Sequence, residues 1–193
     1  YQIMVDRFRD GSSETNPKYF RKWRSEWYTP SEYENNLDQT FYEYFVFSRL
    51  YGGDFKGLTA KLDYLKDLGI NAIYLNPVFQ AESHHKYNAT SFTHIDEHYG
   101  GGLDYSETQS VEILNDSSTW VFNKSDRTFL GFIKEAKSRG FKVIIDAVFN
   151  HVGTRHPAFQ DVKKNKTDSP YYEWFDIHSF APFEYACWAG FGE

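Results

Sequence analysis

The chain has 193 residues, of which 40% are hydrophobic and 25% charged, a composition that fits a packed globular domain and excludes wholesale disorder. Its net charge of −6, together with the lack of a basic run, argues against a nucleic-acid binder. Aromatic residues make up 20% of the chain, and so many flat side chains, 15 Tyr and 5 Trp among them, favour surfaces that stack on a ligand.

The compartment is left unassigned, secreted or cytoplasmic. Cys187 is the only cysteine, so no disulfide forms within the chain. No apolar run approaches the ~20 residues of a membrane span and no signal peptide is visible, so we expect no membrane partner. The chain starts directly in the strand-like YQIMV and stops at WAGFGE, which suggests that both ends belong to a longer protein.

The first predicted elements after YQIMV are a helix and a strand. Apolar residues recur every three or four positions in DFKGLTAKLDYLKDLG, which predicts one amphipathic helix that ends at Gly69. The apolar positions of this helix are Phe55, Leu58, Leu62, Leu65 and Leu68. NAIYLNPVF follows as a strand, and Pro77 ends it.

The same plan repeats further along. SDRTFLGFIKEAKSRG predicts a helix that Ser125 or Asp126 caps and Gly140 ends. Its predicted buried face consists of Phe129, Phe132, Ile133 and Ala136. FKVIIDAVF is the next strand, and both strands are apolar almost throughout, which is typical of strands covered on both faces of a parallel sheet. The alternation of strands and helices predicts the α/β class.

Two long segments, residues 6–51 and 80–124, lack clear periodicity, and each follows a strand. They therefore lie on the side of the sheet that carries the chemistry in parallel α/β proteins. No glycine-rich phosphate motif follows a strand, which removes the main support for a nucleotide-binding domain. We predict one domain over residues 1–153 and the start of a small inserted domain over residues 154–193.

Polar residues follow the second and third predicted strands. In IIDAVFNHVG, Asp146 lies within the third strand, and Asn150 and His151 lie at its carboxyl end. The second strand is followed by SHHKY, which contains His85 and Tyr87. Each residue alone is explained by ordinary hydrogen bonding, but two neighbouring strands that deliver polar groups to one edge indicate a binding site.

These segments resemble the α-amylase family of glycoside hydrolases, specifically its neopullulanase and cyclomaltodextrinase-like bacterial branch. DAVFNHVG is similar to the first conserved region of that family. GGDFKGLTAKLDYLKDLGINAIYLNPVF and SHHKYNATSFTHID are similar to its first helix, second strand and following loop, and SPYYEWFDI and WAGFGE to its inserted small domain. The resemblance implies a (β/α)8 TIM barrel, of which the chain holds three strands and part of the inserted domain.

The resemblance implies a retaining hydrolase that acts on α-glucosidic bonds of starch-like glucans or maltodextrins. In that interpretation His151 hydrogen-bonds the sugar in the cleavage subsite, Asp146 braces the subsite, Tyr87 stacks on the sugar ring and His85 contacts its hydroxymethyl side. The nucleophile, general acid and stabilising aspartate of the family end the fourth, fifth and seventh strands. We therefore assign no catalytic residue here, and we expect the isolated chain to be inactive without the remaining half of the catalytic domain.

A structural Ca²⁺ is also implied by the resemblance. Asn150 offers an oxygen ligand in many family members, and the first loop keeps a second set of ligands: Asp10, Asn16, Gly52 and Asp54. Ser12 stands where the branch has a carboxylate, and a lost charged ligand weakens a calcium site, so occupancy stays open. Asn88 likewise replaces the usual Asp after the loop tyrosine.

Other functions stay open at this point. Transglycosylation or isomerisation of glucosides uses the same scaffold, and a non-catalytic amylase-like binding domain is a second alternative. The retained residues His85, Tyr87, Asp146 and His151 argue against the non-catalytic alternative. His94 and His98 have the spacing of metal ligands, but no supporting cysteines accompany them, so we do not expect zinc.

Overall fold

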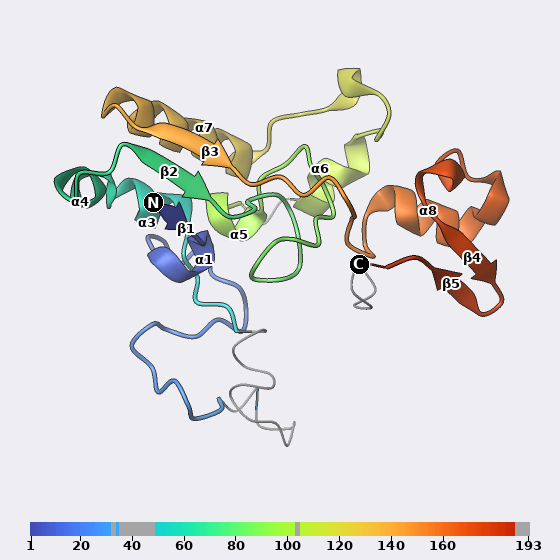
Figure 1. The fold of residues 1–193 in the computed structure, drawn as a ribbon, viewed down its shortest axis with the longest axis horizontal. Coiled ribbons are helices and arrows are strands. Elements are labelled where there is room, and N and C mark those ends of the chain that lie inside the picture. Colours follow the sequence, from blue (N-terminus) through green and yellow to red (C-terminus); the bar gives the residue numbers. More distant parts are fainter. Residues whose placement is uncertain (32–33, 35–48, 103–104, 188–193) are drawn as a thin grey trace.

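The computed structural model describes residues 1–31, 34, 49–102 and 105–187, so WAGFGE lies outside the described residues. Its central feature is a parallel sheet of three strands in the order β1 (Gln2–Ile3), β2 (Ala72–Leu75) and β3 (Lys142–Ile145) (Figure 1). Because the connections run through helices, the predicted alternation of strand and helix is confirmed.

The helix predicted over residues 54–69 is two helices, α3 (Phe55–Thr59) and α4 (Leu62–Asp67). Thr59 donates its hydroxyl to the carbonyl of Phe55 at 2.6 Å, a local bond that bends helices, and Lys61 leaves the helical conformation with ψ 6°. Leu68, the last apolar position of the predicted helix, is 51% exposed. The predicted stop is confirmed, because Gly69 has a φ of +78°.

Helix α7 (Lys124–Ser138) begins at a different cap from the predicted one. Asn123, rather than Ser125 or Asp126, accepts the backbone N–H of Asp126, and Asp126 returns a bond to the N–H of Asn123. This reciprocal capping box satisfies two backbone donors that the first turn leaves open. The predicted stop at Gly140 is confirmed by its φ of +86°.

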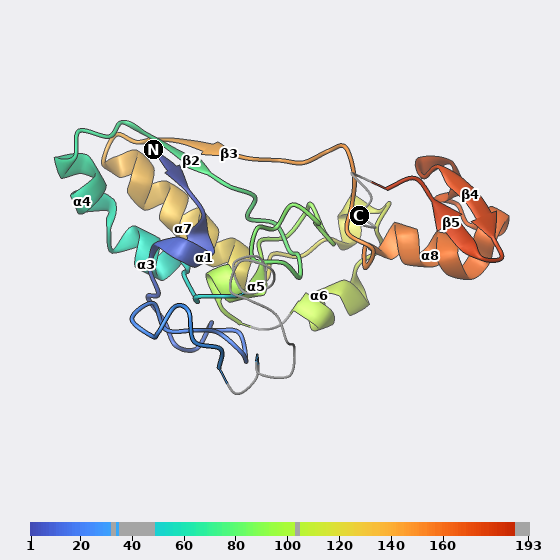
Figure 2. The ribbon, with the colours of Figure 1, turned by 60° about the horizontal axis from the view of Figure 1, so that its bottom comes forward.

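The helices α3, α4 and α7 lie on one face of the sheet (Figure 2). The side chains buried in this layer include Phe55, Leu58, Leu62, Leu65, Ile73, Leu75, Phe132 and Ala136. Ile144 and Ile145 of β3 are 49% and 37% exposed, so the described residues do not cover this strand on both faces as predicted. β3 is the last strand of the three-stranded sheet that the structure describes, and helices pack on a single side of it (Figure 2).

Shorter elements lie in the two long connections between the strands. Helix α1 (Val5–Phe8) follows β1, and the segment after β2 contains α5 (Glu97–Gly100), α6 (Tyr105–Val111) and the 3₁₀ turn η2 (Ser117–Thr119). Among the described residues, no helix has the length and apolarity needed to cross a membrane.

A small unit follows β3 and lies apart from the sheet in both views (Figures 1 and 2). It contains α8 (Pro157–Asn165), the 3₁₀ turns η3 (Lys166–Asp168) and η4 (Tyr172–Trp174), and an antiparallel pair, β4 (Ile177–Phe180) and β5 (Phe183–Tyr185). Phe159 of α8 lies against Phe175, Phe183 and Tyr185, with ring centroids 4.8–5.8 Å away. The boundary between residues 153 and 154 stays a prediction.

Candidate functional site

The carboxyl ends of β2 and β3 lie side by side because the strands pair in parallel, with Leu75 opposite Ile145. Asp146 comes one residue after β3 rather than within it, and its N–H donates to the carbonyl of Leu75 at 2.9 Å. This last ladder bond fixes the backbone from which the Asp146 side chain projects at the sheet edge.

The Tyr87 hydroxyl donates a hydrogen bond of 2.8 Å to Asp146 Oδ2. Burial and then the Asp146 carboxylate raise the pKa of Tyr87 to about 12, since both disfavour the phenolate. Tyr74 on β2 is a neighbour that sequence reasoning missed. The pKa of Tyr74 is also raised, by burial and by Asp146. Side chains alternate between the two faces of a strand, and this alternation is the sequence feature from which Tyr74 could have been predicted to lie near Asp146.

His85 lies beside Tyr87, with ring centroids 5.9 Å apart and ring planes at 37°. Its Nδ1 accepts the backbone N–H of Tyr87 at 3.1 Å. A ring nitrogen that accepts a hydrogen bond carries no proton, so the neutral imidazole keeps its proton on Nε2, where it serves as a donor. Asn88, the departure from the usual Asp, accepts the Ser83 hydroxyl.

The segment after β3 is held against the loop after β2 by Gly153. The Gly153 N–H donates to the carbonyl of Ala89 at 2.8 Å, and a Cβ at Gly153 would lie 2.3 Å from the carbonyl oxygen of Asn88. Only glycine permits this approach. It holds the segment that carries Asn150 and His151, whose side chains contact each other at 3.4 Å, against the Tyr87 loop. Sequence reasoning did not single out this glycine.

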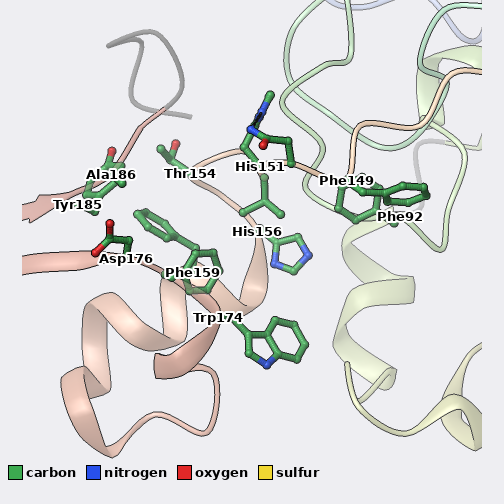
Figure 3. Close-up of a pocket in the computed structure, with 13 residues that line it drawn as sticks. Phe92, Phe149, His151, Thr154, His156, Phe159, Trp174, Asp176, Tyr185 and Ala186 are labelled. Atoms are coloured by element: carbon green, nitrogen blue, oxygen red, sulfur yellow. Dashed lines mark hydrogen bonds between the residues drawn. The ribbon is translucent and has the colours of Figure 1, made fainter.

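A pocket of about 400 Å³ lies between the segment after β3 and the small unit (Figure 3). Aromatic side chains dominate its walls, and its polar members are Asn150, His151, Thr154, His156 and Asp176. Its aromatic lining consists of Phe92, Phe149, Phe159, Trp174, Phe175 and Tyr185. Concave sites with an apolar lining and a few fixed polar groups are the usual form of small-molecule sites.

His156 belongs to this pocket and was not predicted from the sequence. It is 5% exposed, and burial lowers its pKa to about 4, so the ring is neutral at pH 7. Its Nδ1 accepts the N–H of Ala158 at 3.3 Å as the cap of α8, which leaves Nε2–H as a donor. Pro157 after it is the signal for a helix start that the sequence offered.

The first loop brings Asp10, Asn16 and Gly52 together. Asn16 Nδ2 donates to Asp10 Oδ2 at 3.1 Å, and Asn16 Oδ1 is buried without a hydrogen-bond donor among the described residues. A Cβ at Gly52 would lie 2.3 Å from that oxygen. An orphaned amide oxygen beside a carboxylate fits a hard cation such as Ca²⁺.

The other two residues of the implied calcium sets are placed differently. Asp54 caps α3, and its carboxylate accepts the N–H of Gly57 at 2.6 Å and the Thr15 hydroxyl at 3.0 Å. Burial raises the pKa of Asp54, with a smaller contribution from Asp10 in the same direction. Asn150 is exposed and contacts His151 in the segment after β3, and no hydrogen bond among the described residues joins it to Asp10, Asn16 or Gly52.

His94 and His98 have separate partners. His94 lies between Asp126 and Glu112, with 2.8 Å to each carboxylate, and His98 Nδ1 lies 3.0 Å from the carbonyl of Thr15. Burial opposes protonation of His94, but the two carboxylates outweigh it and raise its pKa. Within the described ranges, no three His, Cys, Asp or Glu side chains form a metal cluster.

A profile of the family described as alpha amylase, catalytic domain, matches residues 2–110 and 124–188. The chain belongs to the α-amylase catalytic-domain family. It is 35% identical over 180 residues to the intracellular maltogenic amylase of Bacillus subtilis (strain 168) and 36% identical to a cyclomaltodextrinase of Thermoanaerobacter pseudethanolicus. Each alignment covers 93% of this chain and 24% of the relative, so the chain spans about a quarter of their length.

Solved structures give the same result for the fold. The type III pullulan hydrolase from Thermococcus kodakarensis superposes with a TM-score of 0.72 at 29% identity, over 100% of this chain and 31% of that one. A cyclic α-maltosyl-(1→6)-maltose hydrolase from Arthrobacter globiformis, in complex with cyclic α-maltosyl-(1→6)-maltose, gives 0.70 at 29% identity, over 98% and 35%. The predicted family and barrel fold are confirmed: the chain is a partial fragment of a (β/α)8 catalytic domain.

Proposed function

We propose that the protein to which this chain belongs is a glycoside hydrolase that cleaves α-glucosidic bonds of maltodextrins or related starch-like glucans. The observation that carries the proposal is the 2.8 Å bond from Tyr87 to Asp146, which joins the loops after two neighbouring barrel strands. The matched relatives named as a maltogenic amylase and a cyclomaltodextrinase support this substrate class.

A pyranose ring has one apolar C–H face and a rim of hydroxyl groups, so it needs a flat surface and fixed hydrogen-bonding groups. In the proposal the Tyr87 ring provides the flat surface, and Asp146 holds that ring in place through the hydroxyl. His85 and His151 supply hydrogen bonds to sugar hydroxyls. The aromatic pocket beside His151 accommodates further glucose units of a chain.

The proposal assigns a bracing role to Asp146, because this carboxylate already accepts the Tyr87 hydroxyl. Retaining hydrolysis needs two carboxyl groups about 5 Å apart across the scissile bond. We place the nucleophile, the general acid and the stabilising aspartate in the larger part of the relatives that this chain does not span. The 193 residues alone are accordingly proposed to be inactive until the remainder of the barrel is joined to them.

A structural Ca²⁺ in the first loop is also part of the proposal. Asp10, Asn16 and Gly52 would hold it, and Asp54 would stay the cap of α3. The bound ion would satisfy the buried Asn16 oxygen and cross-link the first loop, which gives it a stabilising role and none in the chemical step.

The full-length protein, assayed on maltoheptaose, cyclodextrins and pullulan, tests the proposal. New reducing ends indicate hydrolysis, whereas longer or rearranged glucosides without new reducing ends indicate transglycosylation or isomerisation. The His151→Ala variant is expected to lose about 5- to 150-fold in kcat/KM, since a lost sugar hydrogen bond costs about 1–3 kcal/mol. An unchanged kcat/KM together with a large drop in Tm would contradict the subsite role of His151.

A further inference from the structure

Lys86 stands between His85 and Tyr87 in a conformation that is unusual for a lysine. Its φ of 62° lies in the left-handed region, where a side chain is strained and glycine is favoured. Its side chain is also only 2% exposed, although an isolated buried ammonium is strongly disfavoured. A strained conformation of this kind persists only where the surrounding contacts hold it in place.

The Lys86 ammonium has a complete set of buried partners. Nζ donates to Asp96 Oδ2 and to the carbonyl of Ala81, each at 2.7 Å, and it lies 5.2 Å from the centre of the Tyr99 ring. Asp96 is fully buried, and it also accepts the N–H groups of Ala81 and of His98. The Asp96 carboxylate therefore joins the start of α5 to the loop after β2, and we call it the anchor of Lys86.

The anchor sets the direction of the two residues that flank Lys86. The Lys86 N–H donates to the Ser83 hydroxyl at 3.1 Å, which closes the turn on its backbone side. With the lysine side chain directed to Asp96, the rings of His85 and Tyr87 lie together at 5.9 Å, and the Tyr87 hydroxyl reaches Asp146. Glycine at position 86 would relieve the φ strain, but it has no side chain to reach Asp96.

We propose that Lys86 is a positioning residue, which anchors the left-handed turn to Asp96 and so fixes the Tyr87 and His85 side chains at the carboxyl edge of the sheet. The inference rests on the proposed function in one respect, namely that the two rings contact a sugar. The rest of the inference does not depend on the substrate: the buried ion pair between Lys86 and Asp96 determines where the Tyr87 ring lies.

Three variants of the full-length protein separate positioning from simple stability. Lys86→Met keeps the length of the side chain and leaves Asp96 without its cation. Asp96→Asn removes the anion and keeps an acceptor for the cap of α5. The double variant Lys86→Met with Asp96→Asn removes both charges, so no unpaired buried charge destabilises it and its Tm should lie above that of Lys86→Met.

Arg49→Met is the matched control. Arg49 forms another buried ion pair, 2.5 Å from Glu34, with side chains 2% and 6% exposed. Arg49 also donates to the carbonyls of Trp27 and Thr29 and interacts with Tyr51, and these partners lie outside the loop that carries Tyr87. The control therefore measures the consequence of losing a buried cation whose named partners are outside the loop that carries Tyr87.

The decisive measurement is the titration of Tyr87, followed by ¹³C NMR of labelled tyrosine and assigned with Tyr87→Phe. Its pKa of about 12 should fall toward 10 in Lys86→Met and in the double variant, because the ring leaves its buried position and Asp146. The same two variants should lose at least about 10-fold in kcat/KM, as expected when one oriented contact is lost. Arg49→Met should leave the Tyr87 titration unchanged.

Each outcome decides the inference. A double variant with a Tyr87 pKa still near 12 makes Lys86 a stabilising residue only, and the inference is overturned. If Lys86→Met does not fold, the double variant gives the same decision. If the full-length protein fails to hydrolyse α-glucans, the proposed function fails, while the Tyr87 titration still tests whether the anchor positions the ring.

Discussion

Tyr87 and Asp146 are 59 residues apart in the sequence and are joined by a hydrogen bond of 2.8 Å between the loops that follow β2 and β3. Tyr87 can therefore contribute to sugar binding in two ways, through the face of its ring and through the hydroxyl that Asp146 holds. Their effects on binding differ, so substitutions at this one position distinguish between them.

Tyr87→Phe keeps the ring and removes the hydroxyl, and Tyr87→Ala removes both. We expect Tyr87→Phe to lower kcat/KM about 5- to 30-fold, because a lost hydrogen bond to a charged group is worth roughly 1–2 kcal/mol. Tyr87→Ala should be at least ten times worse, since the stacking surface is lost as well. Steady-state kinetics of the full-length protein on maltoheptaose is the measurement, and equal losses in both variants would show that the ring contributes nothing.

His156 makes the stability of the protein depend on acidity. Burial lowers its pKa to about 4 in the folded protein, so between pH 6.5 and 4 the unfolded chain binds the proton and the folded chain does not. The contribution of neutral His156 to the free energy of unfolding is fully present above pH 6.5. It is lost as the pH falls from 6.5 to 4, by on the order of 3 kcal/mol. His156→Asn keeps a good helix cap without a titrating ring. Urea unfolding from pH 7 to 4.5 should give a flatter pH profile for this variant, and parallel profiles would contradict the assignment.

Gly153 and Gly131 form a matched pair of glycines. A Cβ at Gly153 would lie 2.3 Å from the carbonyl oxygen of Asn88, so Gly153→Ala should destabilise by about 1–3 kcal/mol. A Cβ at Gly131, exposed inside α7, would meet no atom within 4 Å, so Gly131→Ala should stabilise by roughly 0.5–1 kcal/mol. Thermal unfolding measures both changes, and Tm should fall in Gly153→Ala and rise in Gly131→Ala. Gly153→Ala should also lower kcat/KM, because the segment that carries His151 moves, whereas Gly131→Ala should not. Equal kcat/KM values for both variants would argue against a role of the contact between Gly153 and the loop after β2 in positioning His151.

Calcium should stabilise the folded protein if the first loop binds it. An ion at about 100 times its Kd adds about 2.7 kcal/mol to the free energy of unfolding, and EDTA removes that gain. Asn16→Ala should abolish the response to Ca²⁺, because it removes the buried oxygen that has no other donor among the described residues. Unfolding curves with Ca²⁺, with Mg²⁺ and with EDTA are the comparison. A Ca²⁺ response that survives in Asn16→Ala would place the ion elsewhere.

The sequence alone predicted the repeated strand and helix units, because spacing and turn residues act over a few positions. Gly69 and Gly140 end their helices with φ of +78° and +86°, as near-neighbour sterics require. The same reasoning missed two local alternatives. Thr59 bonds back to Phe55 and interrupts the first helix, and Asn123 caps the second in place of Ser125 or Asp126.

The tertiary structure decided which of the predicted side chains meet. The order of residues places Tyr87 and Asp146 after two strands, but their contact depends on the parallel pairing of β2 with β3 and on the close approach at Gly153. The burial of Lys86 against Asp96 and of His156 beside the aromatic pocket follows no short-range period. Such contacts are determined by how distant segments pack, because burial and pairing depend on neighbours in space, which the local pattern of a sequence does not contain.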